Sequence, residues 1–177
     1  MHRIDGFRPG RLTGVGRPAG TGGSPAATWL VFALLALVTG QPAAEETAAR
    51  LDETFDRDVL VVVADRLGCH RFEVYLAVDP EQRRRGLMYV RSLPERTGML
   101  FVHRYDDLHS MWMKNTFIPL DMLFVRADGS VASIVRDTEP QSLRSIGATE
   151  PVRYVLELNA GVTAALSIGE DSYLVRD

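Results

Sequence analysis

Apolar residues recur along the chain from residue 59 in two patterns. Val59 to Ala64 is an unbroken β-branched and aliphatic run, and Phe72 to Val78 alternates inward and outward positions. Both patterns are typical of β-strands, the second with one face buried. Shorter apolar runs predict further strands at 98–102, 120–125, 131–135, 154–158 and 173–175.

Turn and capping residues separate these runs. Asp79-Pro80-Glu81-Gln82 combines an N-cap acid, a Pro at the first helical position and a capping-box Gln, which predicts a short helix ending near residue 86 or 88. Asp128-Gly129 between two apolar runs predicts a hairpin, and Asn159 is expected to cap a second helix through Leu166. The elements predict an α+β fold, a compact, mostly antiparallel sheet or barrel-like domain with two short helices.

The first 44 residues follow a different pattern. Four Arg lie among Gly, Pro, Ser and Thr ahead of an apolar run at 29–38, and small residues follow the run. Such an arrangement is typical of an export signal, and the run is shorter than the roughly 20 residues of a membrane-spanning helix. We therefore expect 1–44 to be a signal peptide and the protein to be periplasmic or extracellular. The alternative is an uncleaved anchor in the inner membrane through residues 29–38.

The remainder is acidic. Residues 45–58 are predicted to form an acidic tether with one helical turn around Leu51 and Phe55, and 59–177 a single β-rich domain. Beyond residue 44 the chain has 16 basic and 22 acidic side chains, a net charge of −6, which disfavours a nucleic-acid partner. One Cys excludes an intrachain disulfide, and without a Gly-rich phosphate loop or a Cys-x-x-Cys pair we expect no cofactor.

One segment stands out by its composition. Of the 20 basic residues only Lys114 is a lysine, within Trp112-Met113-Lys114-Asn115-Thr116. A single Lys in so Arg-rich a chain suggests that a compact ammonium is needed there, and chance is the alternative.

Five motifs occur in a fixed order: Arg85-Gly86-Leu87-Met88, Gly98-Met99-Leu100-Phe101, Trp112-Met113-Lys114-Asn115-Thr116, Pro119-Leu120-Asp121 and Val155-Leu156-Glu157-Leu158-Asn159. With them the chain from Phe72 to Val175 resembles the bacterial and archaeal domain-of-unknown-function family 192. The resemblance implies a small β-rich domain, often behind an export signal, without an established activity. Val90 stands where that family commonly has an Arg, although Arg91 is adjacent.

Two carboxylates occupy apolar surroundings. Asp121 lies between Leu120 and Met122 and needs a partner, for which Lys114, Asn115 or the amides of 115–119 are nearest in sequence. It either pins that loop or acts as an acid with a displaced pKa in a cleft. Glu157 is similarly placed. If the two carboxylates share a pocket, they provide acid–base chemistry for a hydrolase, with Lys114 stabilising negative charge.

The preferred interpretation is a non-catalytic binding or accessory domain in the cell envelope. Trp112 offers a stacking face and Lys114 and Asn115 offer hydrogen-bond donors, a combination suited to a sugar or another polar ring. Asp121 orients the loop, and Arg91 and Glu157 are its neighbours. The partner is then a small molecule, a glycan or an envelope protein. A core Trp with a Lys extended over it is the structural alternative.

Two metal sites are weaker hypotheses. In a strand, His109, Met111 and Met113 share one face, and their imidazole and thioether groups suit Cu(I) in a periplasmic protein. A harder metal would use His103, Asp106, Asp107 and His109. Met clusters also serve as adaptable core, and polar loops of this kind are usually only solvated.

Overall fold

A computed structural model describes residues 50–64 and 68–176 of the 177. All of them belong to one compact unit, residues 39–177. The predictions for 1–44 and for the first residues of the acidic tether lie outside the described residues. In the part of the chain that is described, no helix is long and apolar enough to cross a membrane.

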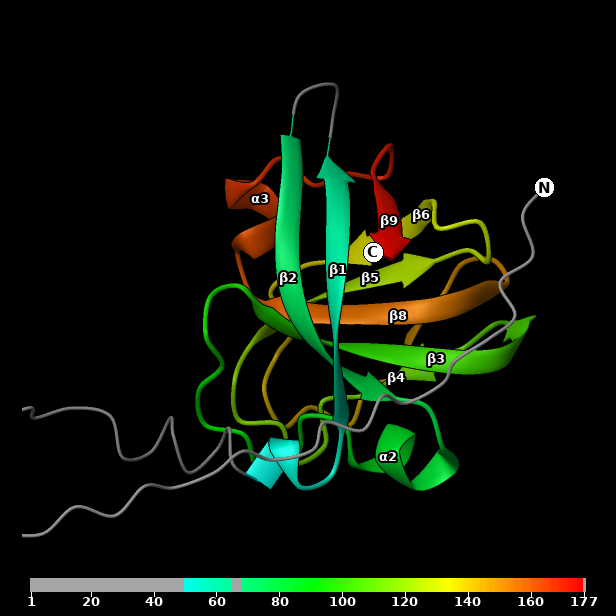
Figure 1. The fold of residues 1–177 in the computed structure, drawn as a ribbon. Coiled ribbons are helices and arrows are strands. Elements are labelled where there is room, and N and C mark those ends of the chain that lie inside the picture. Colours follow the sequence, from blue (N-terminus) through cyan, green and yellow to red (C-terminus); the bar gives the residue numbers. More distant parts are fainter. Residues whose placement is uncertain (1–49, 65–67, 177) are drawn as a thin grey trace, which may run out of the picture. The chain divides into compact units, whose positions relative to one another are not determined.

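The elements follow one another as short strands with two helices between them (Figure 1). In chain order they are β1 (Asp56–Ala64), β2 (Gly68–Ala77), α2 (Pro80–Arg85), β3 (Thr97–Asp107), β4 (Ser110–Met111), β5 (Leu120–Val125), β6 (Val131–Val135), β7 (Ile146–Gly147), β8 (Val152–Asn159), α3 (Val162–Ala165) and β9 (Tyr173–Arg176). One further helical turn lies at residues 50–52.

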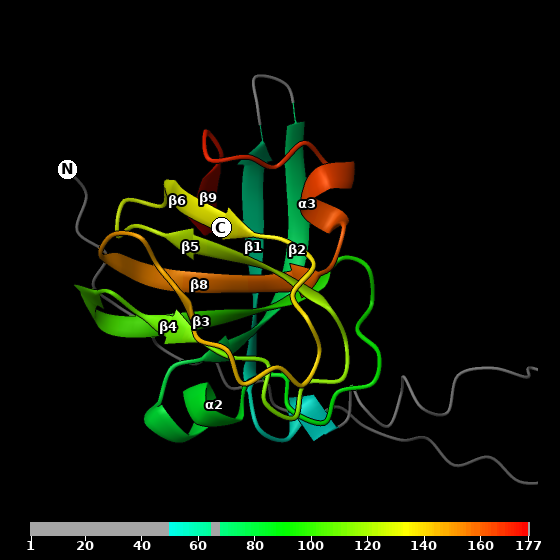
Figure 2. The ribbon, with the colours of Figure 1, turned by 180° about the vertical axis from the view of Figure 1, so that it is seen from behind.

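Seven strands form one curled sheet in the order β6-β5-β8-β3-β2-β1-β9, and β4 pairs with β7 separately. Within the large sheet only β2 and β3 run parallel. The two views show β1 and β2 crossing the direction of β8 and β3 (Figures 1 and 2). A bridge between Ser130 and Tyr173 joins the two edges at one place. The predicted α+β fold with a mostly antiparallel, barrel-like sheet is therefore confirmed.

The sheet curls, and its two faces each pack against a separate hydrophobic cluster. Along β5, Met122 and Phe124 pack with one cluster, while Leu123 and Val125 pack with the other. The first cluster also takes in Met113 and residues of the 87–93 segment, so the loops beside α2 cover this face. A functional group on β8 can thus be buried on either face.

The capping box at Asp79 forms as expected. Its carboxylate accepts from the backbone N–H groups of Glu81 and Gln82, each at 2.8 Å. The Gln82 side chain accepts in return from the Asp79 N–H at 3.2 Å. The helix ends at Gly86, whose φ of 48° favours glycine.

The expected start of the second helix is wrong. The cap of α3 is Gly161, with a φ of 84°, and not Asn159. Asn159 is the last residue of β8, and its side-chain amide donates to the carbonyls of Leu93 at 2.9 Å and Pro94 at 3.2 Å. Because that amide ties the sheet to a distant loop, it does not serve the helix.

The tether interpretation is also wrong for its second half. Leu51 and Phe55 are each only 3% exposed and belong to the core. The Phe55 ring meets Tyr75 edge to face at 6.4 Å, and β1 already begins at Asp56. The folded domain therefore includes the described residues from 50 onward.

Candidate functional site

The segment 112–118, here called the central loop, is held from two sides. Backbone N–H groups of Tyr89 and Gln141 donate to the carbonyls of Asn115 at 2.8 Å and Thr116 at 3.0 Å. The N–H of Met113 donates to the carbonyl of Ser142 at 3.1 Å. These bonds join segments distant in sequence, so the central loop has a fixed place in the fold, and it is not a strand.

Left-handed backbone occurs at each of these junctions. Tyr89, Asn115 and Gln141 have φ values of 67°, 56° and 62°. The conformation is tolerated by Asn and is costly for an aromatic residue. A hydrogen bond from Asn115 offsets part of the cost of the left-handed backbone at Tyr89, because the Asn115 amide donates to the Tyr89 phenol oxygen at 3.0 Å. Asn115 thus positions the loop, and its amide is already engaged by the protein.

Side chains of the central loop alternate between solvent and core. Trp112 is 44% exposed, and the Lys114 ammonium nitrogen lies 5.0 Å from the centroid of its ring. Between them Met113 is fully buried, and its sulfur accepts from the Thr138 hydroxyl at 3.2 Å. The predicted pairing of Trp112 with Lys114 is present, on the surface and as a cation–π contact.

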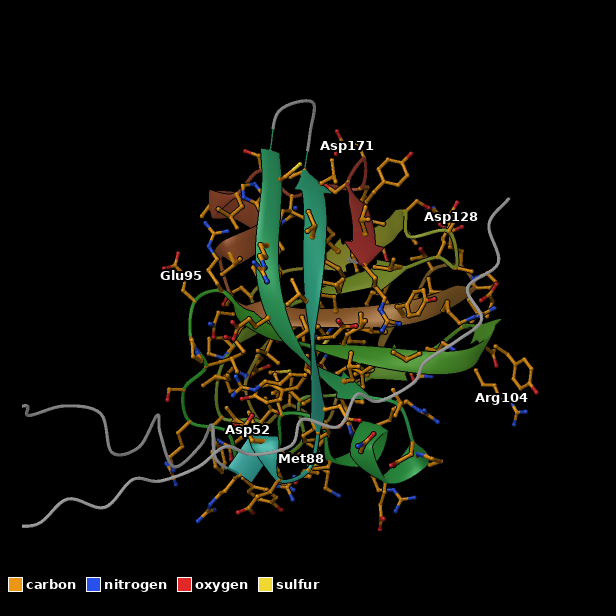
Figure 3. The ribbon with its side chains drawn as sticks, in the orientation of Figure 1. Asp52, Met88, Glu95, Arg104, Asp128 and Asp171 are labelled. Atoms are coloured by element: carbon orange, nitrogen blue, oxygen red, sulfur yellow. The ribbon has the colours of Figure 1, made fainter. Side chains whose placement is uncertain are left out.

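A narrow pocket lies between α2 and the central loop. Its cavity volume is about 20 Å³, room for roughly one water molecule. It is lined by Arg83, Arg84, Arg85, Gly86, Leu87, Met88, Phe101, Met111, Trp112, Lys114, Thr116 and Glu157. Figure 3 labels Met88, one of the lining residues, and so shows that the pocket lies at the end of the domain where α2 is found. Four cationic residues and an indole are therefore among the residues that line it.

Glu157 is the buried polar wall of this pocket. It lies opposite Met99 of β3 and Met122 of β5, and it is only 4% exposed. Burial raises its pKa from 4.5 to about 8, and no hydrogen bond or ion pair from the described residues counters that effect. The carboxyl therefore holds its proton at neutral pH and can donate a hydrogen bond.

Asp121 faces the other side of the sheet. It aligns with Leu158, whereas its neighbour Met122 aligns with Glu157, so the two carboxyl groups do not meet. The Asp121 carboxylate accepts from the Thr163 N–H and hydroxyl at 3.0 and 2.7 Å and from the Asp137 N–H at 3.0 Å. The partners expected from sequence, which were Lys114, Asn115 or the amides of 115–119, are therefore wrong. Asp121 instead anchors α3 and the chain after β6.

The predicted Arg91 does not line the pocket. Its guanidinium lies 5.0 Å over the ring of Phe117. The pocket's arginines come instead from α2, and Arg83 among them is engaged, donating to the carbonyl of Val102 at 3.1 Å. The sequence did carry a signal for them, an Arg-Arg-Arg-Gly run at 83–86, which only the fold places beside Lys114.

Neither proposed metal site is assembled, although two of the proposed ligands do meet. The His109 ring stacks on His103 with centroids 3.5 Å apart, whereas Met113 turns into the core and Met111 is half-buried against it. Over residues 50–64 and 68–176 no group of three His, Cys, Asp or Glu is arranged to hold a metal ion. The site proposed for a harder metal, which combines the two histidines with Asp106 and Asp107, is therefore not formed either.

Among the solved structures that this chain resembles are the following two chains. One, from Sinorhizobium meliloti 1021 and described as a proposed transcription regulator, is 40% identical, covers 69% of this chain and 95% of its own, and has a TM-score of 0.68. The other, a protein of unknown function from Novosphingobium aromaticivorans DSM 12444, is 32% identical, covers 67% and 84%, and has a TM-score of 0.65. No curated protein matches.

A family model described as an uncharacterized ACR, DUF192, matches residues 61–175. The match spans the strands from β1 to β9 and includes the central loop, α2 and Glu157. With the sequence motifs, the fold and this match in agreement, the chain belongs to the DUF192 family.

Proposed function

We propose that the domain is a non-catalytic binding module that recognises a small polar ligand with an anionic group on a ring, of which an acidic sugar is the simplest example. One observation carries the proposal. Glu157 is a buried carboxyl without a partner among the described residues, in a pocket that cationic residues and Trp112 also line.

Each wall of the pocket has a role toward such a ligand. Lys114 and the arginines at 84 and 85 attract the negative charge, and charge-assisted hydrogen bonds are the strong ones. A protonated Glu157 donates to the anion where an ionised carboxylate would repel it. The cavity admits only one small polar group, so the ring stays outside, where Trp112 provides an apolar face.

The location belongs to the same proposal. The basic and apolar pattern of residues 1–44 supports export, and an accessory domain in the cell envelope meets acidic glycans there. Cell fractionation of the full chain and of a chain lacking 1–44 tests this part. Envelope localisation that depends on 1–44 supports export, and cytoplasmic recovery of the full chain contradicts it.

A thermal-shift screen tests the binding function. Galacturonate, glucuronate, the matching neutral sugars, nucleotides and Cu(I) are compared, because a ligand that binds only the folded state raises the melting temperature. We expect the uronates to raise it and Lys114→Ala to abolish the effect.

The matched control is Arg104→Ala. It also removes a cation that lies over an aromatic ring, 5.6 Å from Tyr105, but at the far end of β3 (Figure 3). A uronate shift that survives Lys114→Ala, or no uronate shift at all, contradicts the proposed function.

The hydrolase alternative uses the same carboxyl. A pKa of about 8 suits Glu157 to act as a general acid at neutral pH. The second carboxylate required by the two-carboxylate mechanism is not supplied by Asp121, which lies on the opposite face. Release of nitrophenol from aryl uronides, lost in Glu157→Gln, would favour this alternative over binding alone.

A further inference from the structure

A second and larger hollow adjoins the pocket. It is lined by Ser110, Met111, Trp112, Leu143 and Ser145, with a cavity volume of about 240 Å³. Met111 and Trp112 line both hollows. The volume lies just below the roughly 300 Å³ at which pockets for drug-sized ligands begin, which is room for one ring.

The walls of this hollow are fixed by backbone hydrogen bonds. β4 and β7 pair through Ser110 with Gly147 and Met111 with Ile146. The Ala148 N–H donates to the His109 carbonyl at 3.0 Å and extends this pairing. At the other end the central loop is tied to Ser142, the residue before Leu143. A ligand therefore meets a hollow that is already formed, which reduces the entropic cost of binding.

The chemistry of the walls suits a sugar ring. Leu143 is 71% exposed and Trp112 is 44% exposed, so two large apolar side chains face solvent at the hollow. Ser110 and Ser145 add hydroxyl groups and no charge. A pyranose ring has one apolar face and a rim of hydroxyls, and it matches such a mixture better than an aliphatic chain does.

We propose that the two hollows are neighbouring subsites for one acidic oligosaccharide of at least two units. The unit with the anionic group lies at the pocket of Lys114 and Glu157, and the adjacent ring lies in the hollow of Leu143, with Trp112 between them. This inference rests on the proposed function, because it assigns the first unit to the same pocket.

The test compares chain lengths. Isothermal titration of the full chain with galacturonic acid and with its dimer and trimer should show the dimer binding about tenfold tighter than the monomer, the effect of one added stacked ring. The trimer should gain little more. Leu143→Ser should remove the dimer's advantage and leave the affinity for the monomer unchanged.

Leu108→Ser is the matched control. Leu108 is a similarly exposed leucine, at 61%, that lines neither hollow, so its variant should retain the dimer's advantage. Equal affinities for monomer and dimer, or a dimer advantage that survives Leu143→Ser, would overturn the two-subsite proposal and leave the first pocket standing. Absence of binding at every chain length would instead overturn the proposed function itself.

Discussion

Glu157 carries a proton because burial, and not a partner, determines its pKa. The folded state raises that pKa from 4.5 to about 8. Between these values the unfolded chain releases the proton and the folded chain keeps it. The stability contributed by this group is therefore complete below pH 4.5 and is lost as the pH rises to about 8, by at most about 1.4 kcal/mol per pH unit.

Glu157→Gln should remove this dependence. Urea denaturation of the wild type and the variant at several pH values measures it, and the wild type should lose stability relative to the variant as the pH rises from 4.5 to about 8. Parallel stability profiles for the two proteins would show that the carboxyl is ionised in the folded state.

His103 changes the stability of the fold with pH in the opposite direction to Glu157. Burial, the neighbouring His109 and Arg83 lower its pKa from 6.5 to about 4, so its contribution is lost as the pH falls through that range. The two effects partly cancel between pH 4.5 and 6.5. The Glu157 contribution is therefore measured most directly between pH 6.5 and 8.

Asp121 is a structural carboxylate. Asp121→Asn replaces one acceptor oxygen with a donor, beside three groups that all donate to it. We expect a loss of about 2 kcal/mol in the free energy of unfolding. Thr163→Val should cost less, and the double variant should cost little more than Asp121→Asn, because both changes remove the same bond. Melting within the error of wild type for Asp121→Asn would contradict this role.

Residue roles were only partly predictable. The apolar neighbours of Asp121 and Glu157 indicated that both are buried. The face of the sheet on which each carboxylate lies depends on the register of β8 against β5. This register pairs segments that are distant in the sequence, so no local sequence pattern predicts it. The partner of Asp121, Thr163, is likewise distant in sequence.

At the scale of elements, α2 supplies the arginines of the pocket. Its first turn is fixed by the Asp79 capping box, and Asp79→Ala should lower the free energy of unfolding by about 1 kcal/mol. Glu81→Ala, beside it in the first turn, removes only a weak interaction with the helix dipole and should cost less than about 0.5 kcal/mol. Equal losses in chemical denaturation would mean that the cap is not formed.

Periodicity predicted the strands well because it is a local signal. The predicted runs at 120–125 and 131–135 coincide with β5 and β6. The shared face proposed for His109, Met111 and Met113 assumed a strand, and the side chains of the central loop do alternate between solvent and core. Its true form depends on the turn at Asn115 and on hydrogen bonds to two remote segments, which the alternation does not encode.

At the scale of the molecule, the folded domain begins earlier than the hydrophobic pattern suggests. Phe55→Ala in the full chain should cost about 3–5 kcal/mol, as for a large core side chain. Tyr105→Ala, whose side chain is 68% exposed, should change stability by less than about 0.5 kcal/mol. A small effect at Phe55 in thermal or urea unfolding would restore the tether interpretation. Two isolated apolar residues in an acidic segment were too weak a pattern to predict this.

The curl of the sheet is what brings the site together. α2, the central loop and β8 are far apart in the sequence, yet all three line one pocket. The five motifs pointed to these segments individually, and their convergence came only with the fold. The central claim is therefore that Lys114 and Glu157 belong to a single binding site.

Because Lys114 is the only lysine, an amine-reactive acetylating reagent tests this claim directly. The rate of acetylation at Lys114 is followed by mass spectrometry with and without saturating galacturonate, with the terminal amine as internal reference. The account predicts that ligand slows modification of Lys114 several-fold and leaves the reference unchanged, in wild type and in Arg104→Ala alike. An unchanged rate at Lys114 under conditions where galacturonate is bound would place the ligand elsewhere and contradict the account.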